Sequence, residues 1–198
     1  MSRRERVLLA LLMCGLLLTL AVVFSHGATN DQSNTLEQEA LLEEWKSSVA
    51  EMVRQRRYRE AVPTLRNYLR HAPNDSGMRR LLGKVLFEIR RYPEARDVYY
   101  VALLHDPEDF VARNNLGVVL AKQGKLQDSL RELREAFVSS EHELFVGANL
   151  ARAYESAEDP QAAGEVWRVL SGAARGADEV QIPDDALILD NANVAAKP

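Results

Sequence analysis

Apolar residues recur at helical spacing along most of the chain, and the pattern is clearest between Met78 and Pro107. The first half of this stretch carries one apolar helix face, made of Leu81, Leu82, Val85, Leu86 and Ile89. The second half carries another, made of Ala95, Val98, Tyr99, Ala102 and Leu103. Pro93 suits the first turn of a helix, because the N–H it lacks has no partner there. The stretch therefore predicts two short helices joined by a turn at residues 90–92.

This helix pair recurs at a step of 34 residues. Residues of one class fall in one register: the small residues Ala61, Ala95, Ser129 and Ala163, and the small residues Gly83, Gly117 and Ala151. A helix–turn–helix unit with this period resembles the tetratricopeptide repeat. The resemblance covers about Leu42 to Ala177. It implies an all-α fold in which four helix pairs stack into a short right-handed solenoid.

The pattern divides the chain into four regions. We expect an N-terminal anchor in residues 1–25, a linker in 26–34, a repeat domain in 35–177 and an acidic, flexible tail in 178–198. The repeat copies lie at about 42–75, 76–109, 110–143 and 144–177. Small residues where the helices of a pair cross, such as Gly83 and Ala95, predict a close approach of the two backbones.

The first region contains an apolar run from Val7 to Phe24, preceded by three arginines. As a helix this run would span about 27 Å, close to the ~30 Å of a bilayer core. It is either an uncleaved signal anchor or a secretory signal cut near Gly27. We favour the anchor, because the apolar part of a cleaved signal is normally ~7–15 residues. The arginines then place the N-terminus in the cytoplasm and the repeats in the periplasm, on a bacterial inner membrane. The alternative is a secreted protein.

The last region is acidic but contains one apolar patch, residues 186–189. Three interpretations remain open for it: disorder, a partial cap that covers the apolar end of the stack near Trp167 and Leu170, or a motif that binds a partner.

Composition limits the chemistry. A net charge of −4 argues against a partner held by phosphate contacts, so no nucleic acid is expected. The single cysteine, Cys14, excludes an intramolecular disulfide and a cysteine-based zinc site. The four histidines show no metal-ligand spacing, and no nucleophile, phosphate-loop or zinc-protease motif is present. We therefore expect no cofactor, no bound metal and no catalysis.

The predicted binding surface is the concave face, which the first helix of each pair should line. The candidate residues on it are mostly basic: Lys46, Arg54, Arg80, Lys84, Asn114, Lys122 and Arg152. Such a face suits an extended or helical peptide, and its lysines and arginines would hold the carboxylates of an acidic segment. Some tetratricopeptide domains bind a terminal carboxylate through a clamp of lysines, asparagines and an arginine. Arg80, Lys84 and Asn115 fit that clamp, but Phe145 and Asn149 stand where its next basic pair is expected.

The resemblance implies a non-catalytic scaffold that recruits protein partners in a cell-envelope assembly, and the predicted anchor would hold this scaffold at the membrane. Two alternatives belong to other classes: a periplasmic chaperone-like factor for secreted clients, and a structural subunit that self-assembles into a homo-oligomer.

Overall fold

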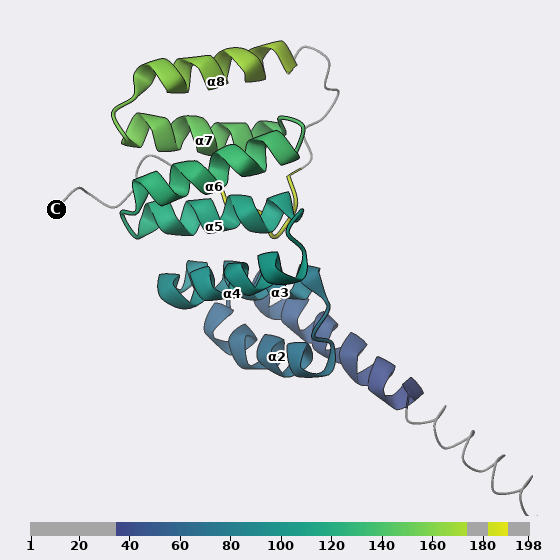
Figure 1. Ribbon diagram of the computed structural model, residues 1–198. Coiled ribbons are helices and arrows are strands. Elements are labelled where there is room, and N and C mark those ends of the chain that lie inside the picture. Colours follow the sequence, from purple (N-terminus) through teal and green to yellow (C-terminus); the bar gives the residue numbers. More distant parts are fainter. Residues whose placement is uncertain (1–34, 174–181, 190–198) are drawn as a thin grey trace, which may run out of the picture. The chain divides into compact units, whose positions relative to one another are not determined.

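The computed structural model describes residues 35–173 and 182–189 (Figure 1). The chain forms two compact units, Met1–Ser47 and Ser48–Pro198. Residues 35–47 of the first unit and 48–54 of the second are helical. The helices that follow in the second unit are α2 (Tyr58–His71), α3 (Ser76–Glu88), α4 (Tyr92–His105), α5 (Phe110–Lys122), α6 (Leu126–Ser139), α7 (Leu144–Ser156) and α8 (Pro160–Ala173). The described part of the chain contains no β-strand.

The helices follow the 34-residue register that the sequence predicts. Helices α3, α5 and α7 begin at residues 76, 110 and 144, and α2, α4, α6 and α8 begin at residues 58, 92, 126 and 160. The all-α repeat architecture is therefore confirmed, with each pair formed by one odd-numbered helix and the even-numbered helix that follows it.

The turn inside each pair is also repeated. Residues 56, 90, 124 and 158 all have positive φ, and only the third of these is a glycine. In every case the next N–H donates to a carbonyl five residues back, at 2.8–3.0 Å. These are the bonds of a Schellman motif, which satisfies the last carbonyls of the first helix. The predicted turn around Arg90 is thus confirmed.

Small residues bring the two helices of a pair together, as the sequence predicts. A Cβ added at Gly83 would lie 2.5 Å from the ring of Tyr99, and one at Gly117 would lie 2.6 Å from Leu133. Ala95, the other small residue of the second copy, is fully buried. Because nothing larger fits, these positions serve the helix crossing.

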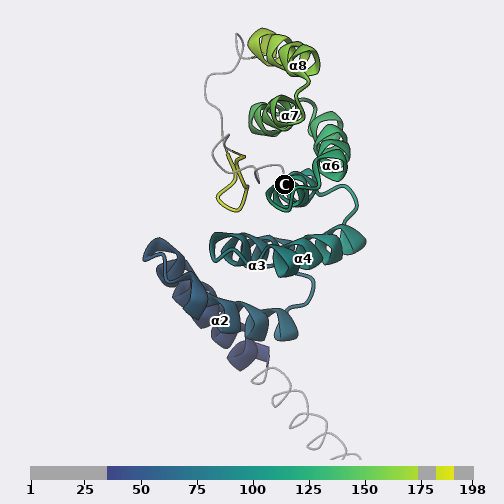
Figure 2. The same cartoon turned by 90° about the vertical axis from the view of Figure 1, so that its left-hand side faces the viewer.

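Helix α5 is the centre of the second unit, and it positions the site described below. Eleven of its 13 residues are buried, so it is covered on nearly all sides. Helices α4 and α6 pack against it, and residues 182–189 lie beside it, drawn in yellow in Figure 2.

No helix in residues 35–173 is both long and apolar enough to cross a membrane. The predicted anchor and linker, residues 1–34, lie outside the described residues.

Candidate functional site

Residues 182–189, which we call the C-terminal segment, bind to side chains of α3, α5 and α7. The segment begins with a tight turn in which the Ala186 N–H donates to the Pro183 carbonyl at 2.9 Å. From residue 186 it has neither helix nor strand. Leu187 and Leu189 are buried, whereas Ile188 between them is 40% exposed. Alternation of this kind is typical of an extended chain with one face against the protein.

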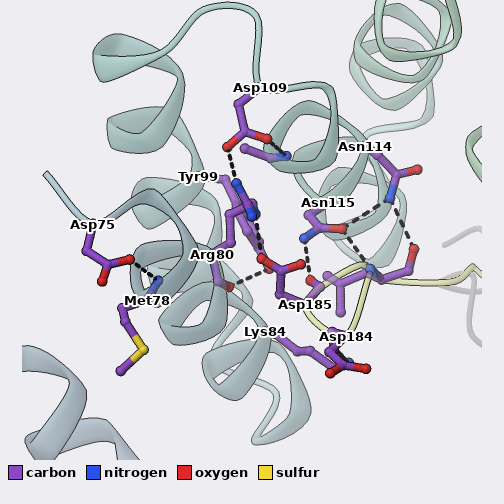
Figure 3. Close-up of polar contacts among 12 residues, drawn as sticks. Asp75, Met78, Arg80, Lys84, Tyr99, Asp109, Asn114, Asn115, Asp184 and Asp185 are labelled. Carbon is purple, nitrogen blue, oxygen red and sulfur yellow. Dashed lines mark hydrogen bonds and ion pairs between the residues drawn. The ribbon is translucent and has the colours of Figure 1, made fainter. Parts of the chain in front are cut away.

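Two asparagines, Asn115 and Asn149, hold the main chain of this segment, and Figure 3 shows Asn115 beside it. The Asn115 side chain donates to the Asp185 carbonyl at 2.7 Å and accepts from the Leu187 N–H at 2.7 Å. The Asn149 side chain donates to the Leu187 carbonyl at 2.8 Å and accepts from the Leu189 N–H at 2.7 Å. The two asparagines occupy the same repeat position, 34 residues apart. One repeat therefore advances the bound chain by two residues.

Asn114 forms hydrogen bonds to both Asn115 and Asn149. Its Nδ2 donates to the Leu187 carbonyl and to Asn115 Oδ1, both at 3.1 Å, and its Oδ1 accepts from Asn149 at 2.8 Å. All three asparagines are fully buried. Because a buried amide without partners costs roughly 1–3 kcal/mol, this network favours the state in which the segment is bound.

Charged groups hold the first part of the segment. The Arg80 guanidinium bonds to Asp185 at 2.5 Å and to Asp109 at 2.7 Å. Lys84 donates to the Asp184 carbonyl. Asp109 also caps α5, since its carboxylate accepts from the Ala112 N–H at 2.9 Å. The start of α5 therefore fixes the position of Arg80.

Arg80 keeps its charge in this setting. Burial disfavours the charged guanidinium, but the hydrogen bonds to Asp109 and Asp185 outweigh burial and raise the pKa of Arg80 above its usual value. Its side chain is 21% exposed, so this ion pair is less screened by solvent than the surface pairs elsewhere in the chain.

Apolar side chains complete the contact. Ala186, Leu187 and Leu189 are buried in the same cluster as the core residues of α5 and α7. Burial of a leucine side chain contributes about 1.5–3 kcal/mol, so the two leucines add to the hydrogen bonds of the main chain. The segment is thus bound by charge, by main-chain hydrogen bonds and by apolar burial together.

Three of the seven candidate residues meet at this surface: Arg80, Lys84 and Asn114. The contacts with the C-terminal segment described above do not include the other four. Lys122 is buried, with its Nζ 5.9 Å from the centre of the Phe87 ring. Arg152 lies on α7 and is partly exposed.

Lys46 and Arg54 each form an ion pair with a glutamate three residues earlier in the chain. Lys46 pairs with Glu43 at 3.0 Å, and Arg54 pairs with Glu51 and keeps 74% of its side chain exposed.

Asn115 and Asn149 were not among the predicted residues of the binding face. Both were compared only with the carboxylate clamp, from which Asn149 departs. A signal was nevertheless present, because Asn-Leu followed by a small residue occurs at 115–117 and again at 149–151. A polar residue that recurs on an apolar helix face indicates a repeated contact.

The apolar patch of the tail also has a definite place. Of the three interpretations left open, the structure favours a fold-back, but onto α3, α5 and α7. Trp167, near which a cap was expected, remains 39% exposed. The rest of the predicted flexible tail, residues 178–181 and 190–198, lies outside the described residues.

We define the segment-binding face as Arg80, Lys84, Asn114, Asn115 and Asn149. No group of three or more potential metal ligands occurs in the ranges that the structure describes. The arrangement is suited to binding an extended chain.

Comparison with known proteins agrees with this fold. Two tetratricopeptide repeat models match the chain, one over residues 52–109 and the other over residues 111–144. No curated protein matches the chain in sequence.

Solved structures with similar folds come from several proteins. MamA from Desulfovibrio magneticus RS-1 is 20% identical with a TM-score of 0.64, over 70% of this chain and 78% of that one. YrrB, described as a TPR protein with an unusual peptide-binding site, is 20% identical with a TM-score of 0.55, over 67% and 73%. The O-GlcNAc transferase of Thermobaculum terrenum is 24% identical with a TM-score of 0.61, over 71% of this chain but 27% of that one. These likenesses extend to the fold alone. The chain therefore contains tetratricopeptide repeats in an all-helical solenoid.

Proposed function

We propose that this chain is a non-catalytic scaffold whose segment-binding face holds an extended segment of a partner protein. One observation carries the proposal: Asn115 and Asn149 each form two hydrogen bonds with the main chain of a non-helical segment. Main-chain bonds of this kind give affinity for an extended chain, and side-chain contacts then select its sequence. The tetratricopeptide fold, which suits protein partners, supports the same function.

The charges on the face favour a partner segment that carries a carboxylate. Arg80 pairs with the Asp185 carboxylate from a partly buried position, and Lys84 beside it donates to the main-chain carbonyl of Asp184. A guanidinium fixed in this way binds a carboxylate more strongly than an exposed lysine would.

A photo-crosslinking experiment tests the partner. A photoreactive residue replaces Lys84 in the native cells, and a matched control replaces Tyr100, a 42% exposed residue of α4. We expect discrete crosslinked proteins from position 84 that are absent at position 100 and weaker when Asn149→Ala is added. The same bands at both positions, or no bands at position 84, would overturn the proposal.

The membrane location is a further part of the proposal. It rests on the apolar run of residues 7–24 and on the arginines before it. We propose a bacterial inner-membrane anchor that places the repeats in the periplasm, where they serve an envelope assembly. A reporter active only outside the cytoplasm, fused after Pro198, should be active. Activity of a cytoplasm-only reporter at the same position would reverse this topology.

A further inference from the structure

The segment-binding face is already filled by the chain's own segment. The Asn149 amide donates to the Leu187 carbonyl and to Asn114 and accepts from the Leu189 N–H. Arg80 is divided between Asp109 and Asp185. A partner that uses the same groups must therefore first displace residues 184–189.

We infer that residues 184–189 are an internal ligand, and that a partner displaces them with a segment of the same chemistry. That chemistry is a carboxylate followed two and four positions later by apolar residues. The inference rests on the proposed function and deepens it, because it names what the face selects and what keeps it closed.

Each position of this motif has a contact that explains it. The carboxylate at Asp185 meets Arg80 at 2.5 Å. The side chains two and four residues later, Leu187 and Leu189, are 3% and 0% exposed. The motif sets no requirement for the side chains of Asp184 and Ile188, because both are exposed. The spacing of two residues matches the step between Asn115 and Asn149.

Tethering makes the internal ligand a strong competitor. Only residues 174–181 separate the end of α8 from the segment. A short tether gives an effective concentration on the order of millimolar. The apparent dissociation constant of an added peptide rises in inverse proportion to the fraction of chains whose face is open. For a peptide with an intrinsic dissociation constant of about 0.1 mM, the closed face weakens binding roughly tenfold.

The test uses the purified full-length chain and a fluorescent peptide with the sequence of residues 182–189, IPDDALIL. Anisotropy measures its binding to the wild type, to Leu189→Asp and to the matched control Ile188→Asp. We expect Leu189→Asp to bind the peptide about tenfold more tightly than the wild type, and Ile188→Asp to equal the wild type. Adding Asn149→Ala to Leu189→Asp should weaken binding by about fivefold to a hundredfold. Equal affinity of all the chains, or no binding by any of them, would overturn the inference.

A milder pair of variants covers the case in which Leu189→Asp fails to fold, which circular dichroism detects. Asp185→Ala removes the carboxylate at Arg80, and Asp184→Ala removes an exposed one whose contact with Lys84 is through the main chain. Tighter peptide binding by Asp185→Ala alone supports the internal ligand, and equal binding by the two variants contradicts it.

Light scattering separates this arrangement from an exchange of segments between copies. A wild-type dimer that becomes a monomer in Leu189→Asp would show that the segment occupies a neighbouring chain, which overturns the internal assignment. The two proposals also fail separately. Peptide results as expected without crosslinked partners at position 84 would sink only the scaffold. Crosslinked partners without tighter peptide binding would sink only the internal ligand.

Discussion

Two sets of residues in this molecule recur 34 positions apart, and they recur for different reasons. Gly83 and Gly117 lie inside helix pairs, where a Cβ would meet Tyr99 or Leu133 at 2.5–2.6 Å. Asn115 and Asn149 lie on the segment-binding face, where each bonds to the main chain of the C-terminal segment. The 34-residue spacing alone does not distinguish a packing residue from a binding residue. The glycine position stays small in the last copy, whereas the asparagine position is Leu81 in α3.

The two ends of the segment-binding face hold the segment by different chemistry. Helix α3 contributes charges, Arg80 and Lys84, to the acidic start of the segment. Helices α5 and α7 contribute buried amides to the part that follows. Charges select side chains of opposite sign, and amides hold any main chain of suitable shape. The packing residues keep the helices in place, and the face divides recognition between these two chemistries.

The largest effect is expected inside a helix pair. Gly83→Leu forces a side chain against the buried ring of Tyr99, which should lower the free energy of unfolding by about 1–3 kcal/mol or more. Urea denaturation monitored by circular dichroism measures this. Gly164→Ala in α8 is the matched control, because a Cβ there meets nothing within 4 Å. It should raise stability by up to about 1 kcal/mol, through helix propensity. Small and equal changes in the free energy of unfolding of both variants would show that Gly83 is not required for the packing of α3 on α4.

The second effect concerns the segment-binding face. Asn149→Ala leaves the Leu189 N–H and the Leu187 carbonyl with fewer partners, at a cost of about 1–3 kcal/mol to the bound segment. Hydrogen exchange should therefore accelerate at the amides of Leu187 and Leu189. The amides of α3 and α4 near their crossing at Gly83 should stay protected. Gln127→Ala, an exposed change on α6, is the control and should leave exchange unaltered. Unchanged protection in Asn149→Ala would show that the asparagine does not hold the segment.

Much of the packing set was predictable from the sequence, because it arises from local pattern. Helix faces, turn positions and the small residues at crossings all repeat within 34 residues, and a periodic sequence displays them directly. The turn at Arg90 and the crossing at Gly83 were found in this way. Their physical cause is the same in every copy, so the copies reinforce one another.

The binding set was predictable only in part, because it depends on a distant segment. Arg80, Lys84 and Asn114 were placed on the inner helices from helical spacing. Asn115 and Asn149 acquire their role only when residues 182–189 return to α5 and α7, a contact that no periodic pattern contains. Lys122 was placed on the face from helical spacing in the same way, yet α5 is buried on nearly all sides.

The smallest effect is expected at Tyr99, where the two sets meet. Its ring packs on Gly83, and its hydroxyl lies 3.4 Å from the Arg80 carbonyl as a weak donor. Tyr99→Phe should therefore cost less than about 1 kcal/mol at neutral pH. Burial, with a smaller contribution from Asp185, raises the pKa of the Tyr99 hydroxyl well above 10.0.

The raised pKa gives this variant a pH signature. Above about pH 10 the unfolded chain loses the tyrosine proton while the folded chain keeps it, so the stability present below that pH declines as pH rises. The decline approaches about 1.4 kcal/mol per pH unit for one proton. Tyr99→Phe removes this titration, so its unfolding free energy should fall less steeply above pH 10 than that of the wild type or of Tyr100→Phe, a change at a 42% exposed position. Parallel pH profiles for the three proteins would mean that the Tyr99 hydroxyl is open to water, and that the helix crossing and the segment-binding face do not meet at this residue.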